Sequence, residues 1–186
     1  MPNCIAIHYH IFTSELGLVL VGESVRGICF LQFGDSSAKL IEQLKEHVPD
    51  NDFIPLSDPT SSRIAQLQKT ITNAIQGFAV ERIPIDPIGS TFQKVVWEHL
   101  RSIPVGVVRS YSEVAQAIGA PQATRAVARA CASNSIALLI PCHRVVRSDG
   151  SLGGFRWGLE RKRALLLAEQ EAHRVPRDSE TTRASR

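Results

Sequence analysis

The sequence lacks any apolar run that approaches the roughly 18 residues needed for a membrane-spanning helix. It also lacks a visible export signal, because the first ten residues, MPNCIAIHYH, contain no basic segment followed by an apolar stretch. Cysteine is scarce, with four residues in 186 and no CxxC pair. These absences predict a cytoplasmic protein with free thiols rather than a disulfide-stabilised secreted protein.

The charges are divided unevenly along the chain, although the net charge is only +3. Residues 1–87 carry 6 Lys and Arg against 10 Asp and Glu, whereas residues 88–172 carry 11 against 6. The basic second half suggests an anionic partner. A chance distribution of solvated surface charge would give the same numbers, so charge alone leaves the question open.

The pattern of apolar residues predicts an α+β fold in two parts. A small antiparallel sheet is expected over three segments rich in Ile, Val and Phe: residues 4–12, 17–22 and 26–33. Two amphipathic helices are expected to follow, over residues 35–48 and 57–78. A connector punctuated by proline and glycine then marks a boundary near residues 80–89, which predicts a mixed α/β N-terminal domain over residues 1–84.

The second part, residues 85–172, is expected to be a mostly helical domain, followed by a flexible tail over residues 173–186. Ser90 and Gln93 fit a capping box ahead of its first helix. Two short helices, within SYSEVAQAIG and PQATRAVARACAS, have the size and turn of a helix-turn-helix. A closing helix carries four leucines that are predicted to pack inward: Leu159, Leu165, Leu166 and Leu167.

The second helix of this pair offers Gln122, Arg125 and Arg129, whose side chains could contact phosphates. Its many alanines leave few long polar side chains to read base edges, which favours contact with DNA that is independent of sequence. An ordinary helical hairpin with solvated arginines would have the same pattern.

Cys142 lies in an apolar passage, LLIPCHRVV, directly before His143. A thiol attacks as its thiolate, and an ordinary thiol pKa of about 8.5 means that a nearby base is needed at neutral pH. Adjacent residues in an extended segment point to opposite sides, so His143 would need a water molecule or a bend at Pro141 to reach the thiol. Glu169 is one acid that could orient His143. Taken alone, a buried inert cysteine is the more common state.

Several motifs together resemble one family. IPCHRVV, residues 140–146, resembles the active-site signature of the O6-alkylguanine-DNA alkyltransferases, also called methylated-DNA–protein-cysteine methyltransferases. Four further motifs match that family in order and spacing: TFQKVVWEHLRSIPVG, SYSEVAQAIG, RAVARACASN and DGSLGGFRWGLERK. The resemblance is close over about residues 85–172, where it is nearest to the C-terminal domain of the bacterial Ada protein. The chain lacks the separate four-cysteine zinc domain of Ada, so it looks like a stand-alone bacterial-type member.

This resemblance implies DNA repair by irreversible, stoichiometric transfer of an alkyl group from O6 of guanine to a cysteine of the protein. The damaged base would first be flipped out of the duplex, because its alkyl group is buried in the stack. The resemblance further implies a monomer that needs no cofactor and binds double-stranded DNA containing O6-alkylguanine. Repair of O4-alkylthymine is left open.

The resemblance also assigns catalytic roles. Cys142 would accept the alkyl group, His143 would deprotonate it through a water molecule, and Glu169 would orient His143. Asn134 would link the second helix of the pair to the active-site loop. Tyr111 would hydrogen-bond the flipped base and assist the rotation of its phosphate.

The remaining roles concern DNA and the base. The implied DNA contacts are Gln122, Arg125, Ala126, Ala128 and Arg129, of which Arg125 would enter the duplex in place of the extruded guanine. Backbone groups of Cys142 and Val145 would read the exocyclic amine of the guanine, and the backbone amide of Arg156 would face O6. Phe155 stands where the family commonly has tyrosine, so the ring is kept and a hydroxyl is missing.

Zinc is a separate question, because some members of the family bind it in the N-terminal domain. Cys4, His8 and His10 share one face of the first expected strand, and Cys29 follows later. Four ligands at zinc spacing are not apparent, so no metal site is predicted.

Two other functions compete with alkyl transfer. A lesion binder or helix-turn-helix regulator without catalysis is one, but alkyltransferase-like binders replace the cysteine that this chain keeps as Cys142. A cysteine hydrolase is the other, and it would need a Cys-His pair with turnover, whereas no separate oxyanion motif stands out.

Overall fold

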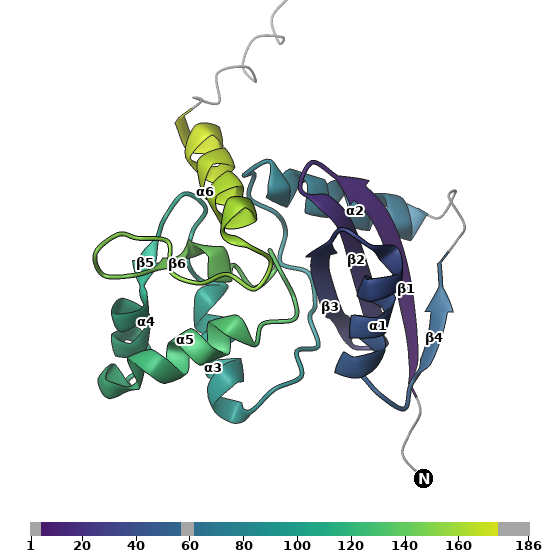
Figure 1. Ribbon diagram of the computed structural model, residues 1–186, viewed down its shortest axis with the longest axis horizontal. Coiled ribbons are helices and arrows are strands. Elements are labelled where there is room, and N and C mark those ends of the chain that lie inside the picture. Colours follow the sequence, from purple (N-terminus) through teal and green to yellow (C-terminus); the bar gives the residue numbers. More distant parts are fainter. Residues whose placement is uncertain (1–4, 57–61, 175–186) are drawn as a thin grey trace, which may run out of the picture.

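The computed structural model describes residues 5–56 and 62–174 and has the predicted α+β architecture (Figure 1). The elements of the first half are β1 (Ala6–Ser14), β2 (Gly17–Ser24), β3 (Gly27–Gly34), α1 (Ser37–His47), β4 (Asp52–Pro55) and α2 (Ser62–Ile75). The elements of the second half are α3 (Thr91–Leu100), β5 (Arg109–Ser110), α4 (Tyr111–Ala117), η1 (Pro121–Ala123), α5 (Thr124–Ala132), η2 (Cys142–Arg144), β6 (Val145–Val146) and α6 (Leu159–Arg174).

The three predicted strands form the antiparallel part of a four-stranded sheet with the order β3-β2-β1-β4. The fourth strand, β4, was not predicted, and it pairs with β1 in parallel at one edge of the sheet. The sheet is buried on both faces: Leu20 packs in the cluster that contains Leu40 and Leu44 of α1, whereas Val19 packs in the cluster that contains Ile71 of α2.

The capping box of α3 is confirmed, since Ser90 Oγ accepts from the backbone N–H of Gln93 and Gln93 Oε1 accepts from that of Ser90. The two predicted short helices are present as α4 and α5, and they pack against each other across the turn at Gly119 and η1. The short parallel pair of β5 and β6 was not predicted.

The inward stripe of α6 differs from the prediction. Leu165 is buried, but Leu159 and Leu167 are 46% and 51% exposed. Consecutive leucines point in different directions around a helix, so they cannot all face the core. The inward positions are instead Lys162, Leu165 and Glu169, spaced three and four residues apart.

The edge strand β3 holds the segment that leads to Cys142. Leu31 donates its N–H to the carbonyl of Ser135 and accepts the N–H of Ala137, both at 2.8 Å. One hydrophobic cluster runs through both halves of the molecule. The division into domains at residue 84 therefore stays a prediction.

Some predictions lie outside the described residues. These are the start of the second helix at residues 57–61, most of the expected tail at 175–186, and Cys4. Residues 173 and 174, which were assigned to the tail, belong to α6. Within residues 5–56 and 62–174, no helix is both long and apolar enough to cross a membrane.

Candidate active site

Cys142 is buried at the start of η2, a short 3-10 helix directly after Pro141. Of the alternatives left open by the sequence, the structure has a bend directly after Pro141, through residues 142–144. The amide of Asn134, itself fully buried, donates from Nδ2 to Cys142 Sγ at 3.2 Å and to the carbonyl of Ile140 at 2.9 Å. Asn134 Oδ1 accepts the N–H of Ile136 at 2.9 Å. One side chain thus fixes both the thiol and the loop that carries it.

The environment of the thiol is apolar but close to positive charge. Burial raises the pKa of Cys142 to about 11, although the hydrogen bond from Asn134 and the charge of Lys162 act to lower it. The resting group at neutral pH is therefore the thiol. Reaction as a nucleophile requires a base, as the sequence predicted.

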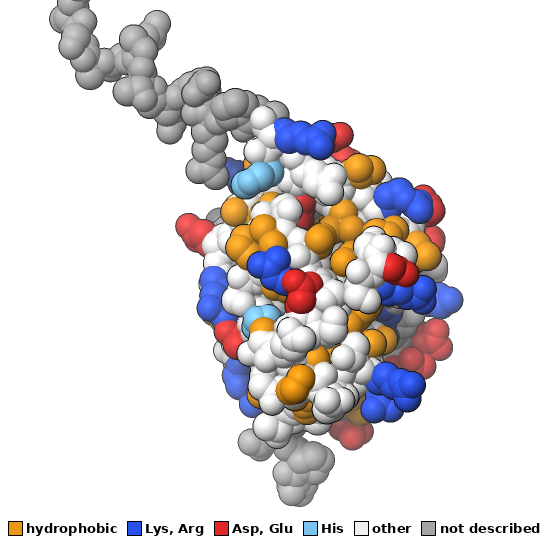
Figure 2. Space-filling view, turned by 90° about the vertical axis from the view of Figure 1, so that its left-hand side faces the viewer, with side chains coloured by type: hydrophobic (Ala, Val, Ile, Leu, Met, Phe, Trp, Pro, Cys, Tyr) orange, Lys and Arg blue, Asp and Glu red, His pale blue; other side chains and the backbone are white. Residues whose placement is uncertain are grey.

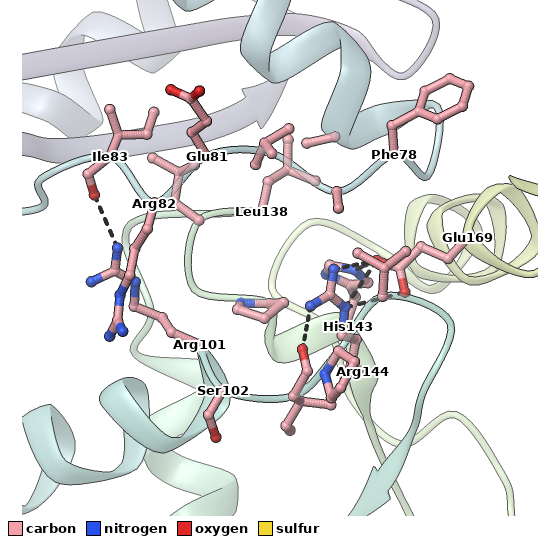
Figure 3. A pocket seen from close by; sticks show the side chains of 18 residues that line it. Phe78, Glu81, Arg82, Ile83, Arg101, Ser102, Leu138, His143, Arg144 and Glu169 are labelled. Carbon is pink, nitrogen blue, oxygen red and sulfur yellow. Dashed lines mark hydrogen bonds and ion pairs between the residues drawn. The ribbon is translucent and has the colours of Figure 1, made fainter. Parts of the chain in front are cut away.

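His143 and Glu169 form the buried pair that the sequence predicted, with 2.8 Å between His143 Nε2 and Glu169 Oε1. Figure 3 shows His143 and Arg144 converging on Glu169 from the active-site loop. Arg144 Nε and Nη2 both donate to this carboxylate, and Glu169 Oε2 accepts the backbone N–H of Gly106 at 3.0 Å. All the polar groups around Glu169 are therefore donors.

These donors determine the protonation of the pair. Burial alone would raise the pKa of Glu169, but the hydrogen bonds and charges of His143 and Arg144 outweigh it and lower the pKa to about 2. Burial lowers the pKa of His143. Neutral His143 then keeps its proton on Nε2, facing the carboxylate, and Nδ1 has a free lone pair. His143 Nδ1 is buried and has no hydrogen-bond partner among the described residues.

Lys162 is a charged residue of the site that sequence reasoning missed. It is fully buried on α6, and its Nζ donates to the carbonyls of Val145 (2.6 Å), Gly154 (3.3 Å) and Leu152. It therefore joins the active-site segment, residues 140–146, to the glycine-rich loop, residues 147–158. A lysine on the inward stripe of an amphipathic helix was the signal that could have revealed it.

Tyr111 and the glycine-rich loop lie together. The Tyr111 hydroxyl lies so close to Gly153 that a Cβ there would be 3.0 Å from it. Burial raises the pKa of Tyr111 to about 12, and the nearby thiols of Cys131 and Cys142 act in the same direction. The hydroxyl is therefore a hydrogen-bond donor at neutral pH.

The other residues implied for the base are placed around this loop. Val145 is buried, and its carbonyl accepts from Lys162. Phe155 packs edge-on against Trp157, with ring centroids 5.0 Å apart. Arg156 is exposed.

The residues implied for DNA contact lie on and before α5. Gln122, Arg125 and Arg129 are exposed, and Ala126 and Ala128 are half-buried. The helix is held from behind by a 2.8 Å hydrogen bond that the Trp97 indole donates to the carbonyl of Ala130. Figure 2 shows basic and acidic side chains interspersed on the face where this half of the molecule lies. A DNA contact would therefore depend on individual arginines rather than on one large basic patch.

The ion pairs that His143 and Arg144 form with Glu169 lie in the wall of a cavity of about 340 Å³. It is lined by His143, Arg144 and Glu169 together with the connector 78–83 and segment 101–105, and Cys142 is not part of its lining (Figure 3). Among the described residues, no group of three or more His, Cys, Asp and Glu side chains could hold a metal ion.

The fold and the site together indicate a protein that acts through a cysteine. Asn134 holds the buried Cys142 thiol, and the next residue, His143, pairs with Glu169. The same half contains a helix pair, α4 and α5, of the size that docks on DNA. Comparison with known proteins agrees. Family models described as 6-O-methylguanine DNA methyltransferase match the chain twice, as the ribonuclease-like domain over residues 7–85 and the DNA binding domain over residues 91–171. The chain belongs to this family.

The similar relatives include two kinds of protein. The Escherichia coli bifunctional transcriptional activator/DNA repair enzyme Ada is 44% identical over 90% of this chain, but the chain spans only 46% of Ada. The Mycobacterium tuberculosis methylated-DNA–protein-cysteine methyltransferase is 38% identical over 92% of this chain and 96% of its own length. The crystal structure of M. tuberculosis OGT in complex with DNA has a TM-score of 0.72 at 32% identity, covering 88% of this chain and 93% of that one.

Proposed function

We propose that this protein repairs double-stranded DNA by moving the alkyl group of an O6-alkylguanine onto Cys142, once per protein molecule. The observation that carries the proposal is the buried site itself, in which Asn134 holds the Cys142 thiol and the neighbouring His143 is paired with Glu169. The proposed chemistry, attack of a thiolate on a saturated carbon, needs no metal.

The proposed reaction starts with the removal of the thiol proton. This proton passes through a water molecule to Nδ1 of His143, and Glu169 stabilises the imidazolium that forms. The Cys142 sulfur then attacks the alkyl carbon, the carbon–O6 bond breaks, and its electron pair stays with the guanine, which takes up a proton. A thioether has no good leaving group, so the protein is consumed after one reaction.

The base must leave the duplex before the sulfur can reach it. In our proposal α5 lies against the DNA, with Ala126 and Ala128 allowing close approach. Gln122 and Arg129 contact the backbone, and Arg125 fills the space of the extruded guanine. The exposure of the three polar side chains supports this arrangement.

The flipped guanine would lie against the glycine-rich loop. Tyr111 donates to the base and assists the rotation of its phosphate, and the backbone carbonyls of Cys142 and Val145 accept from its exocyclic amine. The backbone N–H of Arg156 faces O6, and the ring of Phe155 forms a wall. Three unpaired thiols among the described residues fit a cytoplasmic location.

Mass spectrometry of the protein after exposure to a duplex with O6-methylguanine tests the proposal. We expect one methyl group on the peptide that contains Cys142. Cys131 is a matched control, because it is also buried and burial also raises its pKa. A methyl group on Cys131 instead, or repeated turnover without modified protein, would contradict the proposal, and the second result would favour a hydrolase.

A further inference from the structure

Helix α2 of the first half ends in a compact turn at Gly77. The N–H of Gly77 donates to the carbonyl of Ala74 at 3.2 Å, and the N–H of Phe78 donates to that of Asn73 at 2.9 Å. These are the two hydrogen bonds of a Schellman motif, and Gly77 has the positive φ of 81° that this motif requires. The turn is rigid, because both of its hydrogen bonds close on the helix itself.

Gly77 touches the helix that carries Glu169. A Cβ at position 77 would lie 2.6 Å from the backbone nitrogen of Glu169 and closer still to the carbonyl oxygen of Ala168. Both atoms belong to the backbone of α6, so neither can rotate away. In Figure 3 the chain at Phe78 runs beside the helix that bears Glu169. The α-carbon of a buried glycine therefore lies directly against the Ala168–Glu169 peptide bond.

The carboxylate of the same residue is fixed at its other end. His143, Arg144 and the backbone N–H of Gly106 all donate to it, at distances between 2.8 and 3.1 Å that are normal for hydrogen bonds. The backbone contact with Gly77 and the contacts of the carboxylate together determine how far Glu169 reaches toward His143.

We propose that Gly77 is a positioning residue. Its close contact with the backbone of α6 lets the end of α2 hold α6 in the position where the Glu169 carboxylate meets His143. The N-terminal half would thereby set the geometry of the proton relay without touching the substrate. This inference rests on the proposed function, because it assigns Gly77 a part in the same reaction.

The test compares Gly77→Ala with Gly119→Ala. Gly119 has a similar positive φ of 73°, but a Cβ there meets nothing within 4 Å. Both variants place alanine at a positive φ, and only Gly77→Ala must push α6 away, by about 1 Å to reach ordinary contact distance. Rate constants of methyl transfer are measured in single turnover, with saturating duplex that contains O6-methylguanine. We expect Gly77→Ala to lose up to about 100-fold, which is the scale of a 1 Å misplacement, and Gly119→Ala to stay close to the unmodified protein.

Two further measurements separate positioning from general damage. In a Glu169→Gln background the same Gly77→Ala change is expected to cost little more, because the carboxylate through which Gly77 acts is gone. The rate loss is also expected to shrink as the pH rises from about 7 to 10, since solvent base then replaces the relay. The DNA affinity of Gly77→Ala is expected to be unchanged.

Three results would overturn the inference. They are an unchanged rate for Gly77→Ala, an equal loss in the presence and absence of the Glu169 carboxylate, and a Gly77→Ala protein that does not fold even when bound to DNA. The last would mean that Gly77 maintains the whole fold and does not tune one residue. Failure of the proposed function looks different, because the unmodified protein would then transfer no methyl group.

Discussion

The two halves of the molecule bury different kinds of side chain. The sheet of the first half is filled with aliphatic and aromatic residues, and its buried polar side chains among the described residues are Ser24 and Gln32. The second half buries Ser110, Asn134, Ser135, His143, Lys162 and Glu169. Burial of charged groups costs free energy unless each is paired. Here the Glu169 carboxylate accepts from His143, and Lys162 donates to backbone carbonyls. The second half thus buries charged groups that form the site at a cost in folding free energy, whereas the apolar core of the first half contributes favourable folding free energy.

Removal of the Glu169 carboxylate is expected to have the largest effect on this difference between the halves. Glu169→Ala leaves the buried His143 and the half-buried Arg144 without this acceptor, and we expect a loss of about 3–5 kcal/mol in the free energy of unfolding. Leu20→Ala in the sheet is expected to lower the free energy of unfolding by a similar amount, about 2–5 kcal/mol, because it creates a cavity. Urea denaturation measures both changes. Only Glu169→Ala should also lower the transfer rate of the folded protein, and equal rate losses would erase the distinction between the halves.

Lys162 provides a test of the buried cation near the thiol. Lys162→Met removes the cation that lowers the pKa of Cys142, so the thiol pKa is expected to rise further. The thiolate fraction at neutral pH then falls, and the pH dependence of the transfer rate moves to higher pH. Lys94→Met, on the exposed side of α3, is the matched control and should leave the profile in place. If the unmodified protein, Lys162→Met and Lys94→Met have the same pH profile, Lys162 does not influence the thiol pKa.

A smaller effect is expected at the DNA contact. Arg125→Ala should weaken binding to a duplex and reduce the slope of log affinity against log salt by about one, as expected for the loss of one cation near phosphates. Arg63→Ala removes an exposed arginine that pairs with Glu23 in the first half and should change neither quantity. Equal effects of Arg125→Ala and Arg63→Ala would indicate that DNA does not bind preferentially to the second half of the molecule.

The smallest expected effect is at Phe155. Phe155→Tyr adds one hydroxyl to the wall of the proposed base pocket, and one hydrogen bond contributes about 0.5–1.5 kcal/mol, or up to about tenfold in rate. We expect the change to be larger for a benzyl than for a methyl group. If Phe155→Tyr and the unmodified protein transfer the benzyl group at the same rate, and the methyl group at the same rate, this position has no part in alkyl-group preference.

The strands and helices were predictable where one periodicity dominates. The three strands of the meander and the capping box at Ser90 follow from local pattern, and the structure has them. The strand β4 was not predictable in this way, because four residues ending in Pro55 depend on pairing with β1 for their conformation. The run of leucines at the end of the chain suggested an inward face, yet the helix turns Leu167 to the surface.

The candidate site was predictable in part. The pairing of His143 with Glu169 and the link through Asn134 were expected from the family resemblance, and the structure brings these residues together. Arg144 and the backbone of Gly106 as partners of Glu169, and Lys162 as a bridge between loops, depend on contacts between distant segments. No local pattern contains such contacts.

The central claim is that one thiol accepts one alkyl group and is then spent. The most direct measurement incubates the protein with excess duplex that carries a labelled methyl group on O6 of guanine and counts the label bound to protein. The account predicts a burst that stops at one label per protein, and none for Cys142→Ala. Label on the Cys142→Ala protein, or a count that keeps rising past one, would contradict it.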